Sequence, residues 1–147
     1  MAVLVCLVCA TMSLAQSPQM GTWKLNEAKS KIPAGSPKNV TVKYEAAGDS
    51  IKGTIDGVDG QGKPTHTEWT GKFDGKDYPV TGDMTSDTRA IKQVDDHHYD
   101  LTVKKGGKVT MTGKAVIAAD GKSRTVTVSG KDSMGMKIEA VSVYDKQ

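Results

Sequence analysis

Apolar and polar residues alternate along most of the chain after residue 40. Between Val109 and Ile117, every second residue is apolar or small, and Thr or Lys fills most of the positions between them. A period of two places successive side chains on opposite faces of a β-strand. One face is therefore apolar and the other rich in Thr, Lys and Ser, which is typical of antiparallel sheets with one buried face.

Turn signals separate these alternating stretches. Asp74-Gly75, Gly106-Gly107 and Asp120-Gly121 supply residues that accept the positive φ angles of tight hairpins. Asn26 is expected to cap a short helical turn over residues 27–31, and Pro79 is expected at an edge or a bend. The predicted strands cover residues 22–25, 40–46, 50–58, 64–74, 76–81, 88–94, 98–105, 109–118, 124–131 and 136–144. We therefore expect an all-β meander, either closed as a barrel or folded as a sandwich.

The composition supports this fold class. After the first fifteen residues the chain holds two leucines, Leu25 and Leu101, against 32 residues of Val, Ile and Thr. Leucine favours helices and β-branched residues favour strands, so the composition argues strongly against a helix bundle. Beyond the first fifteen residues, no apolar run approaches the ~20 residues that a membrane-spanning helix needs.

The segment Met1–Ala15 resembles a secretory signal peptide. Thirteen of its fifteen residues are apolar and none is charged, and Ser13-Leu14-Ala15 gives small residues where signal peptidase cleaves. The alternative is a buried N-terminal strand. Cys6 and Cys9 both lie in this segment, so the exported chain would have no disulfide. We expect one barrel domain over residues 16–147, located in the periplasm or secreted.

The charges are numerous but evenly mixed. The formal net charge of +3 comes from 20 Lys and Arg against 17 Asp and Glu. Nucleic-acid sites usually combine a basic stripe with interleaved aromatic residues, and neither is evident. We therefore expect no nucleic-acid partner, and we expect a monomer.

Several inward-facing positions of the predicted strands carry small residues. Small residues either leave volume unfilled or permit the bends that close a barrel. They therefore leave two alternatives for the inside of the barrel. Either the barrel holds a cavity for a small ligand, or its interior collapses around methionines and aromatic rings. The small inward residues are Gly53, Gly71, Gly113, Ala115 and Ala140.

The two ends of the chain resemble a known superfamily. Gly21-Thr22-Trp23-Lys24-Leu25 is similar to the first-strand motif of the lipocalin and fatty-acid-binding-protein (calycin) superfamily, and residues 141–146 resemble the last strand of the fatty-acid-binding branch. The start is also similar to that of small exported bacterial proteins. The resemblance implies an up-and-down barrel of about eight to ten strands, with Trp23 filling one end and a small hydrophobic ligand inside.

The chain also departs from that branch. Tyr144 matches the tyrosine of its ligand-carboxylate site, but Ser142 stands where its arginine would be, and only 14 residues remain for its two-helix lid. Arg124 is in phase with Val126 and Val128, so it points either inward or outward at a strand end; we favour the outward position. The predicted ligand-binding residues are Tyr44, Trp69, Phe73, Met111, Arg124, Ile138 and Tyr144.

The sequence offers little support for catalysis or metal binding. It has no Gly-x-Ser-x-Gly elbow and no phosphate-binding loop. His97-His98 and the pair His66 and Glu68 are the most metal-like groups, and we interpret both as solvent-facing polar residues. We therefore expect a non-enzymatic carrier of a small apolar ligand without a cofactor. The alternative is a structural or interaction module of the cell envelope with a filled core, which would use edge strands near Pro79.

Overall fold

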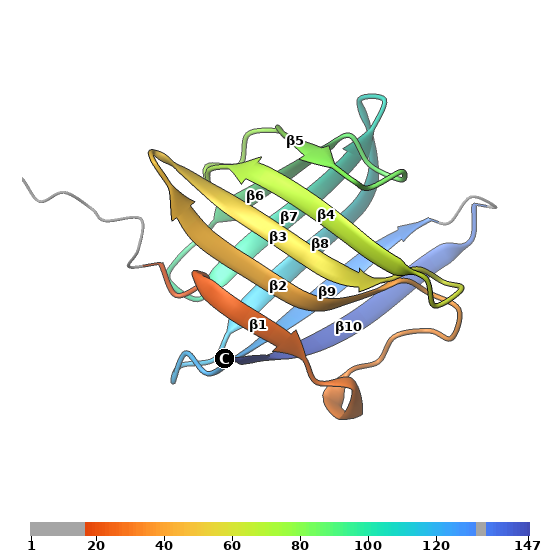
Figure 1. Cartoon of the computed structure of the whole chain (residues 1–147), viewed down its shortest axis with the longest axis horizontal. Helices are drawn as coiled ribbons and strands as arrows, with labels where there is room; N and C mark the ends of the chain where they lie inside the picture. The colour runs from red at the N-terminus through yellow and green to blue at the C-terminus, as the bar shows by residue number, and fades with distance from the viewer. Residues whose placement is uncertain (1–16, 132–134) are drawn as a thin grey trace, which may run out of the picture.

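The computed structural model describes residues 17–131 and 135–147, so the predicted leader lies outside the described residues. Ten antiparallel strands follow one another around a closed barrel, and the first strand pairs with both the second and the last (Figure 1). The predicted all-β barrel is confirmed. No helix in these two ranges is long and apolar enough to span a membrane.

The elements follow the predicted alternation closely. Two of them, β3 and β7, coincide with the predicted ranges. The full set is β1 (Gly21–Leu25), the 3-10 turn η2 (Glu27–Lys29), β2 (Lys38–Ala47), β3 (Ser50–Val58), β4 (Pro64–Gly71), β5 (Tyr78–Thr81), β6 (Thr88–Gln93), β7 (His98–Lys105), β8 (Lys108–Ile117), β9 (Ser123–Lys131) and β10 (Lys137–Lys146).

Strands β4 and β5 are shorter than predicted because the loop between them has its own side-chain hydrogen bonds. One carboxylate oxygen of Asp74 accepts from the backbone N–H of Lys76 at 3.0 Å, and the other accepts from the Tyr78 hydroxyl at 2.7 Å. Such local bonds compete with strand pairing. The alternating pattern therefore continues in the sequence beyond the point where the strand ends.

The connection after β1 is a single short turn. The Asn26 side chain accepts a hydrogen bond from the Lys29 backbone N–H at 3.2 Å, which is the predicted cap. Lys31 then pairs with Val141 through two backbone hydrogen bonds of 2.7 and 2.9 Å. The connection thus runs beside β10 rather than forming a two-helix lid.

The inward faces of the strands make one hydrophobic core. Trp23, at 0% exposure, is its most completely buried side chain, and it comes from the strand that closes the barrel. The buried hydrophobic residues are Met20, Trp23, Leu25, Val42, Tyr44, Ile51, Ile55, Trp69, Val80, Ala90, Ile91, Tyr99, Val103, Ala115, Ile117 and Tyr144.

Aromatic rings occupy the space beside two of the inward-facing glycines. A Cβ atom added to Gly71 would overlap the ring of Tyr78 and lie 2.8 Å from Cζ2 of Trp69. A Cβ on Gly53 would lie 3.0 Å from Cε1 of Tyr44. These glycines therefore make room for large side chains instead of leaving a void.

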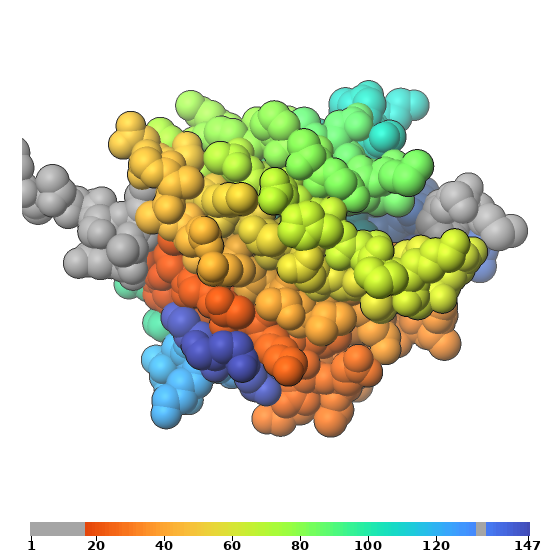
Figure 2. Space-filling view, in the orientation of Figure 1, coloured from red at the N-terminus to blue at the C-terminus, as the bar shows by residue number. Residues whose placement is uncertain are grey.

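The barrel is most weakly closed at β5. This strand pairs through only two residues with β4 and two with β6, and Figure 2 shows the surface hollowed beside β4. Pro79 lies within β5, and because the closed barrel gives that strand neighbours on both sides, the predicted edge position is wrong. The Trp69 indole N–H donates to the Arg89 carbonyl at 2.9 Å and so links β4 directly to β6.

Candidate functional site

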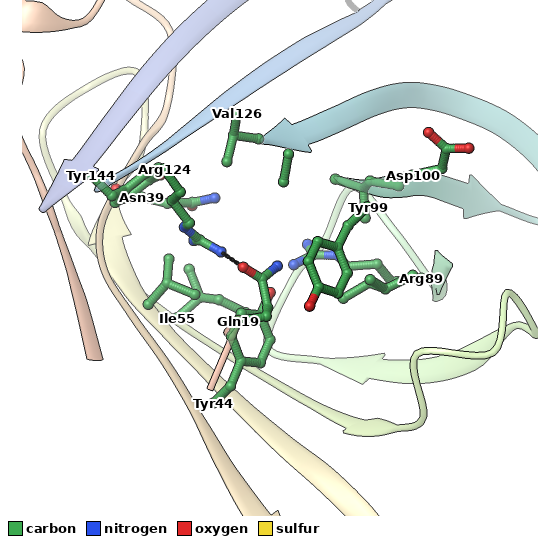
Figure 3. A pocket seen from close by; sticks show the side chains of 14 residues that line it. Gln19, Asn39, Tyr44, Ile55, Arg89, Tyr99, Asp100, Arg124, Val126 and Tyr144 are labelled. Atoms are coloured by element: carbon green, nitrogen blue, oxygen red, sulfur yellow. Dashed lines mark hydrogen bonds between the residues drawn. The ribbon is translucent and has the colours of Figure 1, made fainter. Parts of the chain in front are cut away.

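A small cavity lies inside the barrel. Its volume is about 70 Å³, which is room for a few heavy atoms. Polar side chains reach it from well-separated parts of the chain (Figure 3). Those that shape its chemistry are Gln19, Tyr44, Arg89, Tyr99, Arg124 and Tyr144.

Arg124 points into this cavity, and the outward orientation favoured from the sequence is wrong. The residue is only 4% exposed. Its Cζ atom lies 4.7 Å from the ring centroid of Tyr144, 5.2 Å from Trp23 and 5.7 Å from Tyr44. Ring faces attract a guanidinium group, and the attraction grows when water is excluded. The three rings therefore favour the inward orientation.

The guanidinium of Arg124 has no acidic partner among the described residues. Its Nη1 donates to Oε1 of Gln19 at 2.9 Å, and its Nε has no hydrogen-bond partner in the described part of the chain. Asp100 also borders the cavity, but its carboxylate points away from it (Figure 3) and pairs with Lys114 at 3.2 Å. A buried charge without a counter-ion is costly, so an anion in the cavity would lower that cost.

A second arginine, Arg89 of β6, reaches the same cavity from the opposite side (Figure 3). Its Nη2 lies 3.7 Å from Oδ2 of Asp83, and its Nε also lacks a partner among the described residues. Burial opposes the ionisation of Asp83, yet hydrogen bonds from Ser86 and Thr85 lower the pKa of its carboxyl group. Asp83 thus remains an anion that offsets the charge of Arg89 but not that of Arg124.

Two tyrosine hydroxyls complete the polar lining. The Tyr144 hydroxyl donates to the Asn39 carbonyl at 3.0 Å, and the Tyr99 hydroxyl shares a hydrogen bond of 2.8 Å with the Ser17 hydroxyl. Burial raises the pKa of both phenols, although the nearby Arg124 partly opposes the shift at Tyr144. Both tyrosines are therefore neutral near pH 7 and offer hydrogen bonds without adding negative charge.

The predicted ligand-binding residues separate into three groups. Tyr44, Arg124 and Tyr144 line the cavity. Trp69 and Phe73 lie in an adjoining aromatic cluster, with stacked rings whose centroids are 6.2 Å apart. Met111 and Ile138 are half-buried and do not line the cavity.

Sequence reasoning missed Gln19, Arg89, Tyr99 and Asn39. A signal existed for Arg89, because it is two residues before the buried Ile91 and therefore shares its face. No such signal existed for Gln19, which precedes the first strand and belongs to no alternating pattern.

Ser142 stands where the resemblance to the fatty-acid-binding branch led us to look for an arginine, yet a guanidinium does accompany Tyr144. It comes from the neighbouring strand, since Arg124 and Tyr144 are paired directly across β9 and β10. Directly paired residues of an antiparallel ladder place their side chains on the same face. Arg124 and Tyr144 therefore lie side by side on the inner face of the barrel.

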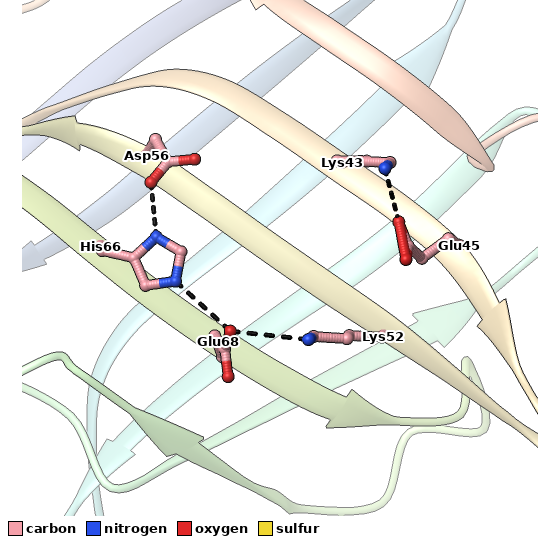
Figure 4. Close-up of polar contacts among 6 residues, drawn as sticks. All are labelled: Lys43, Glu45, Lys52, Asp56, His66 and Glu68. Atoms are coloured by element: carbon pink, nitrogen blue, oxygen red, sulfur yellow. Dashed lines mark hydrogen bonds and ion pairs between the residues drawn. The ribbon is translucent and has the colours of Figure 1, made fainter.

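Of the residues considered as metal ligands, His66, Glu68 and His98 lie on the outer surface, whereas His97 is half-buried and its Nδ1 has no hydrogen-bond partner among the described residues. The His66 ring contacts Asp56 through Nδ1 and Glu68 through Nε2, and Glu68 also pairs with Lys52 at 3.5 Å (Figure 4). The carboxylates occupy opposite sides of the ring, so they do not converge on one point with it. In residues 17–131 and 135–147, no group of three His, Cys, Asp or Glu side chains is arranged to hold a metal ion.

Comparisons with known proteins give structural neighbours only. No protein-family model matches the chain, and neither does any curated protein. A de novo designed fluorescence-activating β-barrel matches with a TM-score of 0.44 and 14% identity, over 87% of this chain and 93% of that one. Lobster apocrustacyanin A1 matches with a TM-score of 0.44 and 12% identity, over 90% of this chain and 62% of that one.

Proposed function

We propose that this chain is an exported, non-catalytic binding protein for a small ligand with an apolar body and an acidic group. The observation that carries the proposal is the buried guanidinium of Arg124, whose Nε has no partner among the described residues and which faces a cavity with no acidic partner for it. Apolar burial supplies most of the affinity of such sites, and a few polar groups set the orientation of the ligand.

The lining suits a carboxylate. A carboxylate accepts charge-assisted hydrogen bonds from a guanidinium, and these are about twice as strong as bonds between neutral groups. The Tyr44 and Tyr144 rings hold Arg124 from two sides. The apolar body of the ligand would lie against cavity residues such as Ile55 and Val126.

The test uses a matched pair of probes. Octanoate and 1-octanol have the same number of carbons and differ at the head group, and each is titrated against the protein by calorimetry. We expect octanoate to bind at least tenfold more tightly, because a hydrogen bond to a charged group contributes about 1.5–3 kcal/mol. Equal affinities, or no binding of either probe, would count against the proposal.

The matched variant is Arg124→Met, which keeps an unbranched side chain and removes the guanidinium and its charge. We expect it to lose about 10- to 100-fold in octanoate affinity and to change 1-octanol binding little. Lys114→Met is the control, because it removes a positive charge from the outer surface, where Lys114 pairs with Asp100. If both variants weaken octanoate equally, general electrostatic attraction explains the binding.

The volume of the cavity favours one alternative. At about 70 Å³ it is small, and the interior around it is packed with aromatic rings. An interaction module with a filled core would have such an interior. Failure of both probes, together with capture of one stoichiometric protein partner, would support that alternative.

A further inference from the structure

The segment before β1 enters the end of the barrel and fills part of its interior. Gln19 is 2% exposed and Met20 is buried. The segment makes a tight turn in which the Met20 backbone N–H donates to the Ser17 carbonyl at 3.0 Å. Burying a glutamine side chain costs free energy unless hydrogen bonds replace those lost to water. The contacts that Gln19 makes inside the barrel must therefore compensate for its burial.

Two polar contacts of Gln19 involve residues that line or close the cavity. Its Oε1 accepts from Arg124, and its backbone carbonyl accepts from the Trp23 indole N–H at 2.9 Å. The neighbouring Ser17 hydroxyl bonds to Tyr99 at 2.8 Å. The segment is therefore fastened to both an arginine and a tyrosine of the candidate site.

The Gln19 amide stands where an acidic group would bind. Its carbonyl oxygen is an acceptor like a carboxylate oxygen but carries no charge, and it engages one nitrogen of Arg124 and leaves Nε unpaired. A carboxylate forms stronger, charge-assisted bonds and can bind a guanidinium through two oxygens. An acidic ligand is therefore the better partner for Arg124.

The amide and a ligand compete for the same space. With Gln19 in place, about 70 Å³ remains, which is too little for the apolar body of a ligand such as octanoate. The segment is held by individual hydrogen bonds and by the burial of Met20 in the core, and it lies outside the strand ladder. Segments of this kind open at a low free-energy cost compared with core strands.

We propose that Ser17–Met20 is an internal competitor: Gln19 occupies the anion position at Arg124, and ligand binding expels the segment from the barrel. This inference rests on the proposed function and adds the regulation of the same site. The apparent dissociation constant is the intrinsic one divided by the fraction of open molecules. If closed molecules outnumber open ones by a factor of about 5–30, which corresponds to a free-energy difference of about one or two kcal/mol, the segment weakens ligand binding by the same factor.

Three variants test the competition by octanoate titration. Gln19→Ala removes the competing amide, and we expect about 5- to 30-fold tighter binding. Gln19→Glu places a carboxylate beside Arg124, and we expect weaker binding than in the unchanged protein. Gln61→Ala, in the exposed turn between β3 and β4, is the matched control and should bind as the unchanged protein does.

A second measurement follows the segment directly. The NMR signal of the Trp23 indole N–H reports the hydrogen bond to the Gln19 carbonyl, and we expect octanoate to shift it and to speed its exchange with solvent. If octanoate binds but this signal stays unchanged, or if Gln19→Ala binds no more tightly, the competition is refuted while the proposed function stands. If octanoate binds neither the unchanged protein nor Gln19→Ala, both fail.

Discussion

The space beside Gly71 allows a quantitative test of how the barrel interior is packed. In Gly71→Ala the new methyl group would overlap the Tyr78 ring and crowd Trp69. The Trp69 ring has little freedom to move because its indole N–H is bonded to the Arg89 carbonyl. Extra atoms in a well-packed core cost about 1–3 kcal/mol. We therefore expect a loss of about 2 kcal/mol in the free energy of unfolding.

Gly53→Ala is the comparison that separates crowding from glycine flexibility. Its new Cβ would approach only Tyr44 closely, at 3.0 and 3.3 Å from two ring carbons. Replacing glycine by alanine also stabilises the folded protein by about 0.4–1 kcal/mol, because it reduces the conformational entropy of the unfolded chain. We expect a net change within about 1 kcal/mol, well below the loss in Gly71→Ala.

The assay is thermal and urea unfolding followed by circular dichroism. A loss of 2 kcal/mol corresponds to a fall in Tm of about 8 °C for a domain of this size. In a Tyr78→Ala background the cost of Gly71→Ala should shrink by at least ~1 kcal/mol, because the main clash is gone. The reasoning is refuted if that cost is the same in both backgrounds, or if both glycine variants behave alike.

Four further outcomes are expected. Ile51→Ala, at a side chain 1% exposed, should lower the free energy of unfolding by about 2–5 kcal/mol in urea titrations, and a loss below 1 kcal/mol would contradict the core assignment. Asn26→Ala should cost about 1 kcal/mol in the same assay, since it removes the cap of the 3-10 turn. Hydrogen bonds with two carboxylates raise the pKa of His66 above 6.5, so the unchanged protein should gain stability relative to His66→Gln as the pH falls from 8 to 6; the opposite trend would contradict the contacts. Burial raises the pKa of Tyr144 above 10, so the unchanged protein should lose more stability than Tyr144→Phe between pH 9 and 11.

The strand pattern was predictable because it depends on local alternation, whereas the site depends on contacts between distant residues. The alternation of β8 follows from its own sequence. The inward position of Arg124 does not, because the rings that favour it come from β1, β2 and β10. A general preference for keeping charge at the surface gave the wrong orientation. The phase of Arg124 with Val126 was the better guide.

Gln19 illustrates a different reason for failure. It lies 105 residues from Arg124 in the chain, in a segment with no periodic pattern. Nothing in the residues around it distinguishes a buried amide from an exposed one. Gly71 shows a third reason: alternation placed it inside the barrel, but only the three-dimensional structure shows that the ring of Tyr78 takes up the space.

The short pairing of β5 has a consequence for how the barrel moves. A barrel whose strands are hydrogen-bonded along their full length opens only when many hydrogen bonds break together. In contrast, β5 is paired with each neighbour through only two residues, so few bonds must break for it to separate. Amide exchange should therefore be fastest at this seam and slowest across β2, β3, β9 and β10. Open edges invite pairing with other chains. When β5 is exposed by such opening, Pro79 has no N–H to donate, which makes the strand a poor template for pairing with another chain. Transient opening at this seam therefore carries little risk of self-association.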